Sequence, residues 1–144
     1  MKSIVEQILR ENHLSVTTGR KTILNLFLQS AHALIHSDIE KQCVGVVDRV
    51  GIYRTLQIFL RKNIIHSIPT ADDGIKYALS KVNSRTKQTS VSHAHFVCNN
   101  CKKTICLDTI NMPEIRLPAG FKMRDCEVLI KGTCTDCKHV YTDY

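Results

Sequence analysis

The chain has 144 residues, of which 43% are hydrophobic and 23% charged, a composition typical of a globular protein with room for one ordinary domain or two small ones. No segment approaches the roughly 18 to 20 consecutive apolar residues of a membrane helix, and the first residues do not resemble a secretory signal. The formal net charge of +7 suits a polyanionic partner. We therefore expect a cytoplasmic protein that does not enter membranes.

Three helical patterns open the sequence, and each follows a residue suited to cap a helix N-terminus. These residues are Ser3, in a capping box with Glu6, then Thr17 or Thr18, and Ser37, in a capping box with Glu40. Short connections between the patterns predict a compact bundle. A fourth, longer helix is expected to begin after Asp48 and to end near Asn63. Helical spacing predicts that it buries Val50, Leu56, Leu60 and either Ile52 or Tyr53. Its exposed face would carry Arg49, Arg54, Thr55 and Gln57.

Strand-like patterns follow the fourth helix. The runs IIHSIPT and IKYALS flank a turn that contains Gly74, which predicts a β-hairpin. Helices followed by such a hairpin indicate a winged helix-turn-helix domain at residues 1–80, and the polar, basic segment 81–92 is typical of a hinge. Residues 93–144 combine the β-rich runs HFVC, TICL and CEVLIKGTC with a short helix and loop in NMPEIRLPAG, which predicts a small α/β domain. The predicted fold class is α+β.

Two CxxC pairs give the most specific signal: Cys98 with Cys101, and Cys134 with Cys137. Both thiolates of such a pair can bind one ion, and two pairs complete the tetrahedral Cys₄ shell that structural zinc prefers. Lysines that follow the pairs closely would favour the thiolates: Lys102, Lys103 and Lys138. The alternatives are two independent redox sites or buried cysteines that bind nothing, but no βαβ pattern accompanies either pair. The sequence therefore predicts a structural zinc in the C-terminal domain.

His93 and His95 precede the first cysteine pair in a strand-like run. Alternate residues of a strand share a face, so both imidazoles could bind one metal ion. The alternative is a pair of solvated histidines at a domain edge. Cys106 lies on the next predicted strand and Cys126 on a later one, and each could be a third ligand or a small core residue. These residues define a candidate regulatory metal site.

The helix-turn-helix pattern predicts a DNA-reading surface on the fourth helix. The residues expected to reach bases or phosphates there are Tyr53, Arg54, Thr55 and Gln57. Arg20 and Lys21, at the start of the second helix, are expected to hold the DNA backbone. The alternative is a helical domain that binds protein, with Tyr53 in its core.

These features, in this order, resemble the ferric uptake regulator family over nearly the whole chain. The segments that carry the resemblance are TTGRKTILNLF, GIYRTLQIFLRKNII, IKYAL, HAHFVCNNCKKTICL and GTCTDC. The resemblance implies a homodimer built through the C-terminal α/β domains, a hinge that positions the winged helices, and operator binding that depends on a regulatory metal. It assigns the four cysteines of the CxxC pairs to a structural zinc site. It also assigns DNA contacts to Arg20, Tyr53 and Arg54.

The resemblance places His93 and His95 on two ligands of a sensing site near the hinge. That site departs from the iron-type pattern, because Ala78 and Cys106 stand where the family has acidic residues. His32 lies near the position at which the family's N-terminal domain contributes a histidine. A further site of the family is lost or rebuilt here, since its positions carry Ser92, Ala94 and Cys126.

We therefore predict a metal-responsive transcriptional repressor, not an enzyme, which binds palindromic double-stranded operator DNA as a homodimer and has no small organic substrate. Replacement of a carboxylate by Cys106 makes the regulatory site softer and favours Zn²⁺ as the sensed ion. The alternatives are an iron- or peroxide-sensing family member, a constitutive apo-dimer, a redox enzyme, and a zinc-stabilised interaction module that never contacts DNA. No nucleophile elbow, phosphate loop or metalloprotease motif indicates catalysis. The sequence assigns no role to Cys43 or Cys126.

Overall fold

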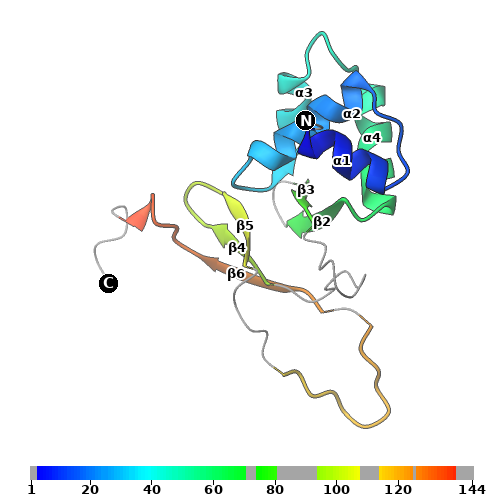
Figure 1. Cartoon of the computed structure of the whole chain (residues 1–144). Helices are drawn as coiled ribbons and strands as arrows, with labels where there is room; N and C mark the ends of the chain where they lie inside the picture. Colours follow the sequence, from blue (N-terminus) through cyan, green and yellow to red (C-terminus); the bar gives the residue numbers. More distant parts are fainter. Residues whose placement is uncertain (1–2, 71–73, 81–93, 108–113, 125, 139–144) are drawn as a thin grey trace. The chain divides into compact units, whose positions relative to one another are not determined.

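The computed structural model of the chain describes residues 3–70, 74–80, 94–107, 114–124 and 126–138. The chain divides into two compact units, Met1–Lys81 and Val82–Tyr144 (Figure 1). The predicted hinge at 81–92 and His93 lie outside the described residues. None of the helices in the described part of the chain is long and apolar enough to cross a membrane.

The first unit contains four helices, whose N-termini are fixed by local capping. They are α1 (Ile4–Glu11), α2 (Thr18–Gln29), α3 (His36–Gln42) and α4 (Arg49–Arg61). Three of the predicted caps are confirmed: the side chains of Ser3, Thr17 and Asp48 accept backbone N–H groups of the first turns. The predicted capping box at Ser37 is wrong, because α3 begins at His36 directly after a strand and has no side-chain cap.

A three-stranded antiparallel sheet completes the first unit. Its strands are β1 (Leu34–Ile35), β2 (Ile65–Thr70) and β3 (Gly74–Leu79), in the order β1-β3-β2. The predicted hairpin is confirmed as β2–β3, in which His66 pairs with Ala78. Gly74 has φ 77°, a left-handed conformation that glycine adopts without strain. The helices followed by this hairpin form a winged helix-turn-helix.

The core of the first unit lies between the helices and the hairpin. Helix α4 contributes Ile52, Leu56 and Phe59, none more than 1% exposed. The prediction that α4 buries Val50 is wrong, because the stripe begins at Ile52 and continues at i+3, i+4 and i+7, which leaves Val50 53% exposed. The predicted exposure of Thr55 is also wrong. Thr55 lies within the buried stripe, and its hydroxyl donates to the Gly51 carbonyl at 2.8 Å.

The second unit is built on another three-stranded sheet. Its strands are β4 (Ala94–Cys98), β5 (Thr104–Leu107) and β6 (Val128–Gly132), in the order β5-β4-β6. β4 pairs antiparallel with β5 and parallel with β6. The three predicted β-rich runs are thus confirmed as strands. The short helix predicted in NMPEIRLPAG is not found in its described part, residues 114–120. Pro118 has no backbone N–H to donate to a helical hydrogen bond there.

Candidate metal centre and nucleic-acid interface

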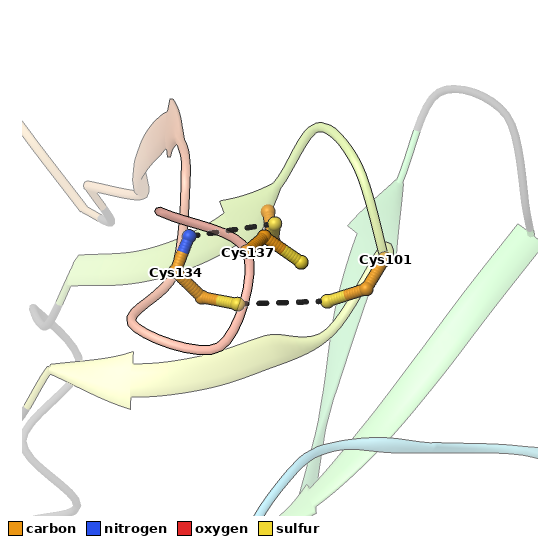
Figure 2. A group of neighbouring side chains, drawn as sticks. Cys101, Cys134 and Cys137 are labelled. Carbon is orange, nitrogen blue, oxygen red and sulfur yellow. Dashed lines mark hydrogen bonds between the residues drawn. The ribbon is translucent and has the colours of Figure 1, made fainter. Parts of the chain in front are cut away.

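The two CxxC pairs lie in turns at one end of the second sheet. In the first turn, Lys102 N–H donates to the Cys98 carbonyl and Cys98 N–H donates to the Lys103 carbonyl, both at 2.9 Å. In the second, Cys137 N–H donates to the Cys134 carbonyl at 3.1 Å. Because β4 and β6 run in parallel, their C-terminal ends lie at the same end of the sheet, and the two turns meet there (Figure 2).

The four cysteines form one cluster. Their Sγ atoms all lie within 4.8 Å of one another, and the Cys101 and Cys134 sulfurs are 3.7 Å apart. In a tetrahedral zinc shell with Zn–S distances of ~2.3 Å, neighbouring sulfurs are about 3.8 Å apart. The chain has seven free cysteines, so these four are thiols rather than disulfides. The donor set and its spacing fit a tetrahedral metal site, and one shared cluster argues against two independent redox pairs.

The pKa values of two cysteines of the cluster, Cys98 and Cys137, are shifted in opposite directions. The amide of Cys101 and then that of Cys134, which lies 3.4 Å from the Cys98 sulfur, lower the pKa of Cys98 to about 6. At Cys137 the Asn100 side-chain amide favours the thiolate, but burial and the neighbouring thiols outweigh it and raise the pKa of Cys137 to about 11. Four thiolates within 4.8 Å of one another would repel, and a divalent cation would compensate their charge.

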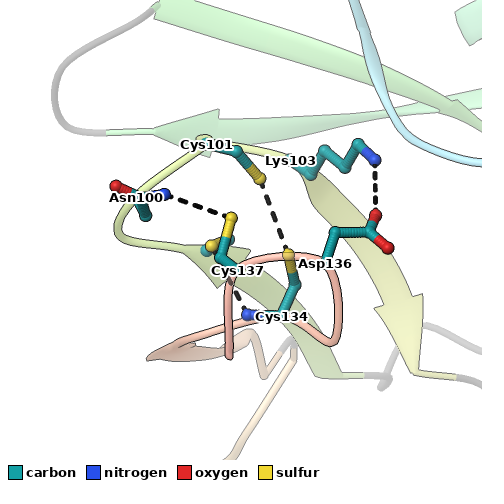
Figure 3. A network of polar contacts seen from close by, with 7 residues as sticks. Asn100, Cys101, Lys103, Cys134, Asp136 and Cys137 are labelled. Carbon is teal, nitrogen blue, oxygen red and sulfur yellow. Dashed lines mark hydrogen bonds and ion pairs between the residues drawn. The ribbon is translucent and has the colours of Figure 1, made fainter. Parts of the chain in front are cut away.

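Besides the contacts among the cysteines, two polar contacts made by Asn100 and Lys103 join the turns (Figure 3). The Asn100 side-chain amide donates to the Cys137 sulfur at 3.2 Å. The Lys103 ammonium donates to an Asp136 carboxylate oxygen at 2.9 Å, an ion pair that raises the pKa of Lys103. Each contact links a residue of the first turn to a residue of the second. These partners orient the turns and restrict the geometry of the ligands.

Three of the candidate regulatory ligands, His32, His95 and Cys106, lie within the described residues. His95 on β4 pairs directly with Cys106 on β5, and the metal-binding atoms of these two side chains lie within 4.8 Å of each other. His95 is 7% exposed and Cys106 is half-buried. His32 lies exposed before β1, where its backbone N–H donates to the Ser30 hydroxyl at 3.3 Å. The structure thus brings together two of the predicted candidate ligands within one unit.

Sequence reasoning missed a histidine of the hairpin. His66 on β2 stands directly across from Ala78 on β3, and its Nδ1 lies 3.4 Å from the Ser80 hydroxyl oxygen. The family resemblance leads us to expect an acidic residue at position 78, where this chain has alanine. The His66 imidazole stands beside this position. The signal that could have found His66 is the register of the two predicted strands, which pairs it with Ala78. Cys43 is fully buried in the first unit's core, and Cys126 is half-buried in the second unit.

The exposed face of α4 is the candidate nucleic-acid interface. Tyr53 is 57% exposed and Arg54 is exposed, whereas Gln57 is half-buried. Arg20 is held at the start of α2, where its guanidinium donates to the Ser15 carbonyl at 3.0 Å and to the Ser15 hydroxyl at 2.6 Å. Lys21 lies 3.8 Å from a Glu6 carboxylate oxygen. Tyr53 and Arg54 are therefore accessible on the helix that a winged helix-turn-helix presents to DNA.

Known proteins resemble the chain along most of its length. The sequence model of the ferric uptake regulator family matches residues 11–131. A ferric uptake regulation protein of Synechococcus elongatus is 26% identical over 139 residues, with 90% of each chain covered. The peroxide operon regulator of Bacillus subtilis is 23% identical over 138 residues, covering 91% of this chain and 89% of that protein. The solved structure of a zinc uptake regulator with zinc and DNA superposes with a TM-score of 0.66 at 17% identity, covering 96% of this chain and 98% of that one.

The chain belongs to the ferric uptake regulator family. The family match and the winged helix agree on a metal-responsive transcriptional repressor, which is not an enzyme. The likeness to the zinc uptake regulator supports the fold alone.

Proposed function

We propose that the chain is a zinc-responsive repressor that binds palindromic operator DNA as a homodimer and holds a structural zinc in its Cys₄ cluster. The observation that carries the proposal is the facing pair of His95 and Cys106, a nitrogen and sulfur donor set in place of the family's carboxylate. Imidazole and thiolate donors suit Zn²⁺, whereas carboxylates suit Mn²⁺ and similar harder ions. The regulatory site thus favours zinc by its ligand chemistry.

The regulatory ion needs more ligands than these two side chains provide. His93 is the first candidate, since it lies two residues before His95 in the same strand-like run. His32 and His66 are candidates from the first unit, and His66 is supported by its place opposite Ala78 in the hairpin. A ligand from the winged helix would couple metal binding to the position of the DNA-reading helices. Such coupling is reciprocal, so operator DNA would tighten zinc binding by the same factor.

We propose that the homodimer forms through the second unit. Large apolar side chains there are 38–69% exposed in the single chain: Ile105, Ile115, Leu117, Phe121, Met123, Leu129 and Ile130. Three of these side chains lie on β5 and β6 and four lie in the segment before β6, and so much exposed apolar surface on a small unit is typical of an interface. Leu129 on β6 is 40% exposed, and we expect Leu129→Glu to produce monomers that keep the Cys₄ metal. Analytical ultracentrifugation measures the oligomeric state.

DNA contact is assigned to Arg20, Lys21, Tyr53, Arg54 and Gln57. We expect Tyr53→Ala or Arg54→Ala to weaken operator binding by about 1 to 3 kcal/mol each, without unfolding the chain, if each side chain contacts a base. Arg20→Ala should act uniformly across sequences, because a phosphate contact carries no base information. Unchanged affinity in all three variants would place the reading surface elsewhere.

A titration of DNA binding with different metals tests the function. The protein is purified without added metal and treated with a mild chelator, which should leave the Cys₄ ion in place. Zn²⁺ is then added, and the protein is used to select duplexes from a random DNA library. We expect affinity for the selected duplex to rise about 5- to 150-fold with Zn²⁺ and less with Mn²⁺ or Fe²⁺. The affinity should fall steeply with salt as counterions are released. A larger response to Fe²⁺ or Mn²⁺ would favour iron or peroxide sensing, and an equal affinity with and without metal would indicate a constitutive dimer.

A further inference from the structure

The N-terminal end of α4 is apolar as well as basic. Val50 lies in the first turn of the helix with 53% of its surface exposed, and Tyr53 follows one turn later at 57%. Residues three apart in a helix lie on the same face, so the isopropyl group and the aromatic ring form a continuous apolar strip. Neither side chain belongs to the core of the first unit.

The first turn of α4, which carries Val50, has a fixed local structure. Asp48 caps α4 by accepting the Gly51 N–H at 2.7 Å. A Cβ at Gly51 would lie 2.8 Å from the Asp48 carboxylate oxygen and 2.9 Å from a Val47 methyl carbon, so no side chain fits there. Gly51 therefore packs against Val47 and Asp48, about 100° around the helix from Val50, and the Asp48 cap fixes the first turn that carries Val50.

Charge on either side of the strip suits a polyanion. The side chain of Arg49 is 78% exposed and Arg54 is exposed as well. Arg49 lies 3.3 Å from a Glu40 carboxylate oxygen, a contact exposed enough to be exchanged for a phosphate. Two guanidinium groups flanking an apolar strip match a groove that is lined by phosphates and contains apolar groups.

We propose that Val50, beside Tyr53, recognises the C5 methyl group of a thymine in the major groove. The inference rests on the proposed function, in which α4 reads DNA. Thymine carries the only methyl group that an unmodified base presents in the major groove, and apolar side chains contact it. The N-terminal residues of a recognition helix are those that reach base edges. Val50 is thus a specificity-determining residue, and the operator carries a thymine opposite it in each half-site.

Deoxyuridine substitution tests the proposal, because it removes the methyl group and leaves all hydrogen-bonding groups of the base in place. Each thymine of the selected duplex is replaced singly, and binding of the zinc-loaded dimer is measured by fluorescence anisotropy. We expect one symmetry-related pair of positions at which loss of each methyl weakens binding about fourfold, the effect of one buried methyl group. The variant Val50→Ala should bind the thymine duplex more weakly and no longer distinguish thymine from deoxyuridine at that position.

Ile4→Ala is the matched control, since Ile4 is an equally exposed aliphatic residue, at 58%, on α1. It should keep the full thymine preference. If Val50→Ala retains the wild-type ratio of affinities at every position, the proposal is overturned even though the protein binds DNA. If no duplex is selected and no salt-dependent binding occurs, the proposed function itself fails. The two failures are therefore distinguishable.

Discussion

The two candidate metal centres lie on the same small sheet and differ in the source of their ligands. The Cys₄ cluster takes all its ligands from two turns that meet where β4 and β6 end. At the other candidate centre, the paired strands β4 and β5 contribute His95 and Cys106. A site completed within one unit binds its ion as part of the fold, whereas a site that needs further ligands can report on conformation. On this difference rests our proposal that the Cys₄ cluster holds a structural ion and the second centre a regulatory one.

Removing a ligand of the closed site should have the largest effect. Cys98→Ser or Cys137→Ser takes away a buried thiol, and we expect loss of the metal and unfolding of the second unit, because binding of structural zinc can contribute about 10 to 16 kcal/mol to folding. Metal content by mass spectrometry and thermal unfolding measure the effect. Cys126→Ser is the matched control, a half-buried cysteine outside the cluster that should leave metal and melting temperature unchanged. A stable dimer without metal at the Cys₄ site would contradict the structural role.

Removing ligands of the open site should abolish the response and preserve the fold. In the His93→Ala/His95→Ala double variant we expect zinc to change DNA affinity less than twofold, compared with about 5- to 150-fold in the wild type. The Cys₄ metal and the dimer should persist. The single variants His66→Ala and His32→Ala would show whether either histidine of the first unit takes part. If the double variant keeps the full response to zinc, the switch lies elsewhere.

Exchange of a single ligand should alter selectivity rather than remove the response. Cys106→Glu places a carboxylate opposite His95, and we expect the preference for Zn²⁺ over Mn²⁺ to fall about tenfold, because a carboxylate is a harder donor than a thiolate. Competition titrations of the two ions, read out by DNA binding, measure this ratio. Cys106→Ala is the companion variant and should weaken both ions. An unchanged ratio in Cys106→Glu would show that Cys106 is not a ligand.

The sequence predicted those parts of the fold that depend on neighbours in the chain. The caps at Ser3, Thr17 and Asp48 and the hairpin around Gly74 were predictable because each is set within a few residues. The phase of α4 was harder, since Val50 and Ile52 are both apolar and pattern alone favours neither. The core selects Ile52 through packing with residues distant in sequence.

The same distinction applies to the candidate sites. The spacing within each CxxC pair indicated a metal-binding turn, but the meeting of both turns depends on the parallel pairing of β4 and β6, which spacing does not specify. His66 went unnoticed because its relation to Ala78 exists only in the register of the paired strands. Contacts between turns, such as Lys103 with Asp136, likewise required the structure.

The smallest expected effect concerns the ion pair between Lys103 and Asp136. Its removal should change how fast the metal is released and leave the amount of bound metal unchanged. Lys103→Met removes the 2.9 Å ion pair with Asp136 and keeps most of the side-chain length. Exposed ion pairs stabilise proteins weakly, so we expect an unchanged fold and full metal content. The two turns would be less firmly joined, and the metal should transfer to a chelator about twofold faster. Lys138→Met, which changes the lysine directly after Cys137, is the control and should not change the rate. Equal rates in both variants and the wild type would mean that the backbone alone holds the turns together.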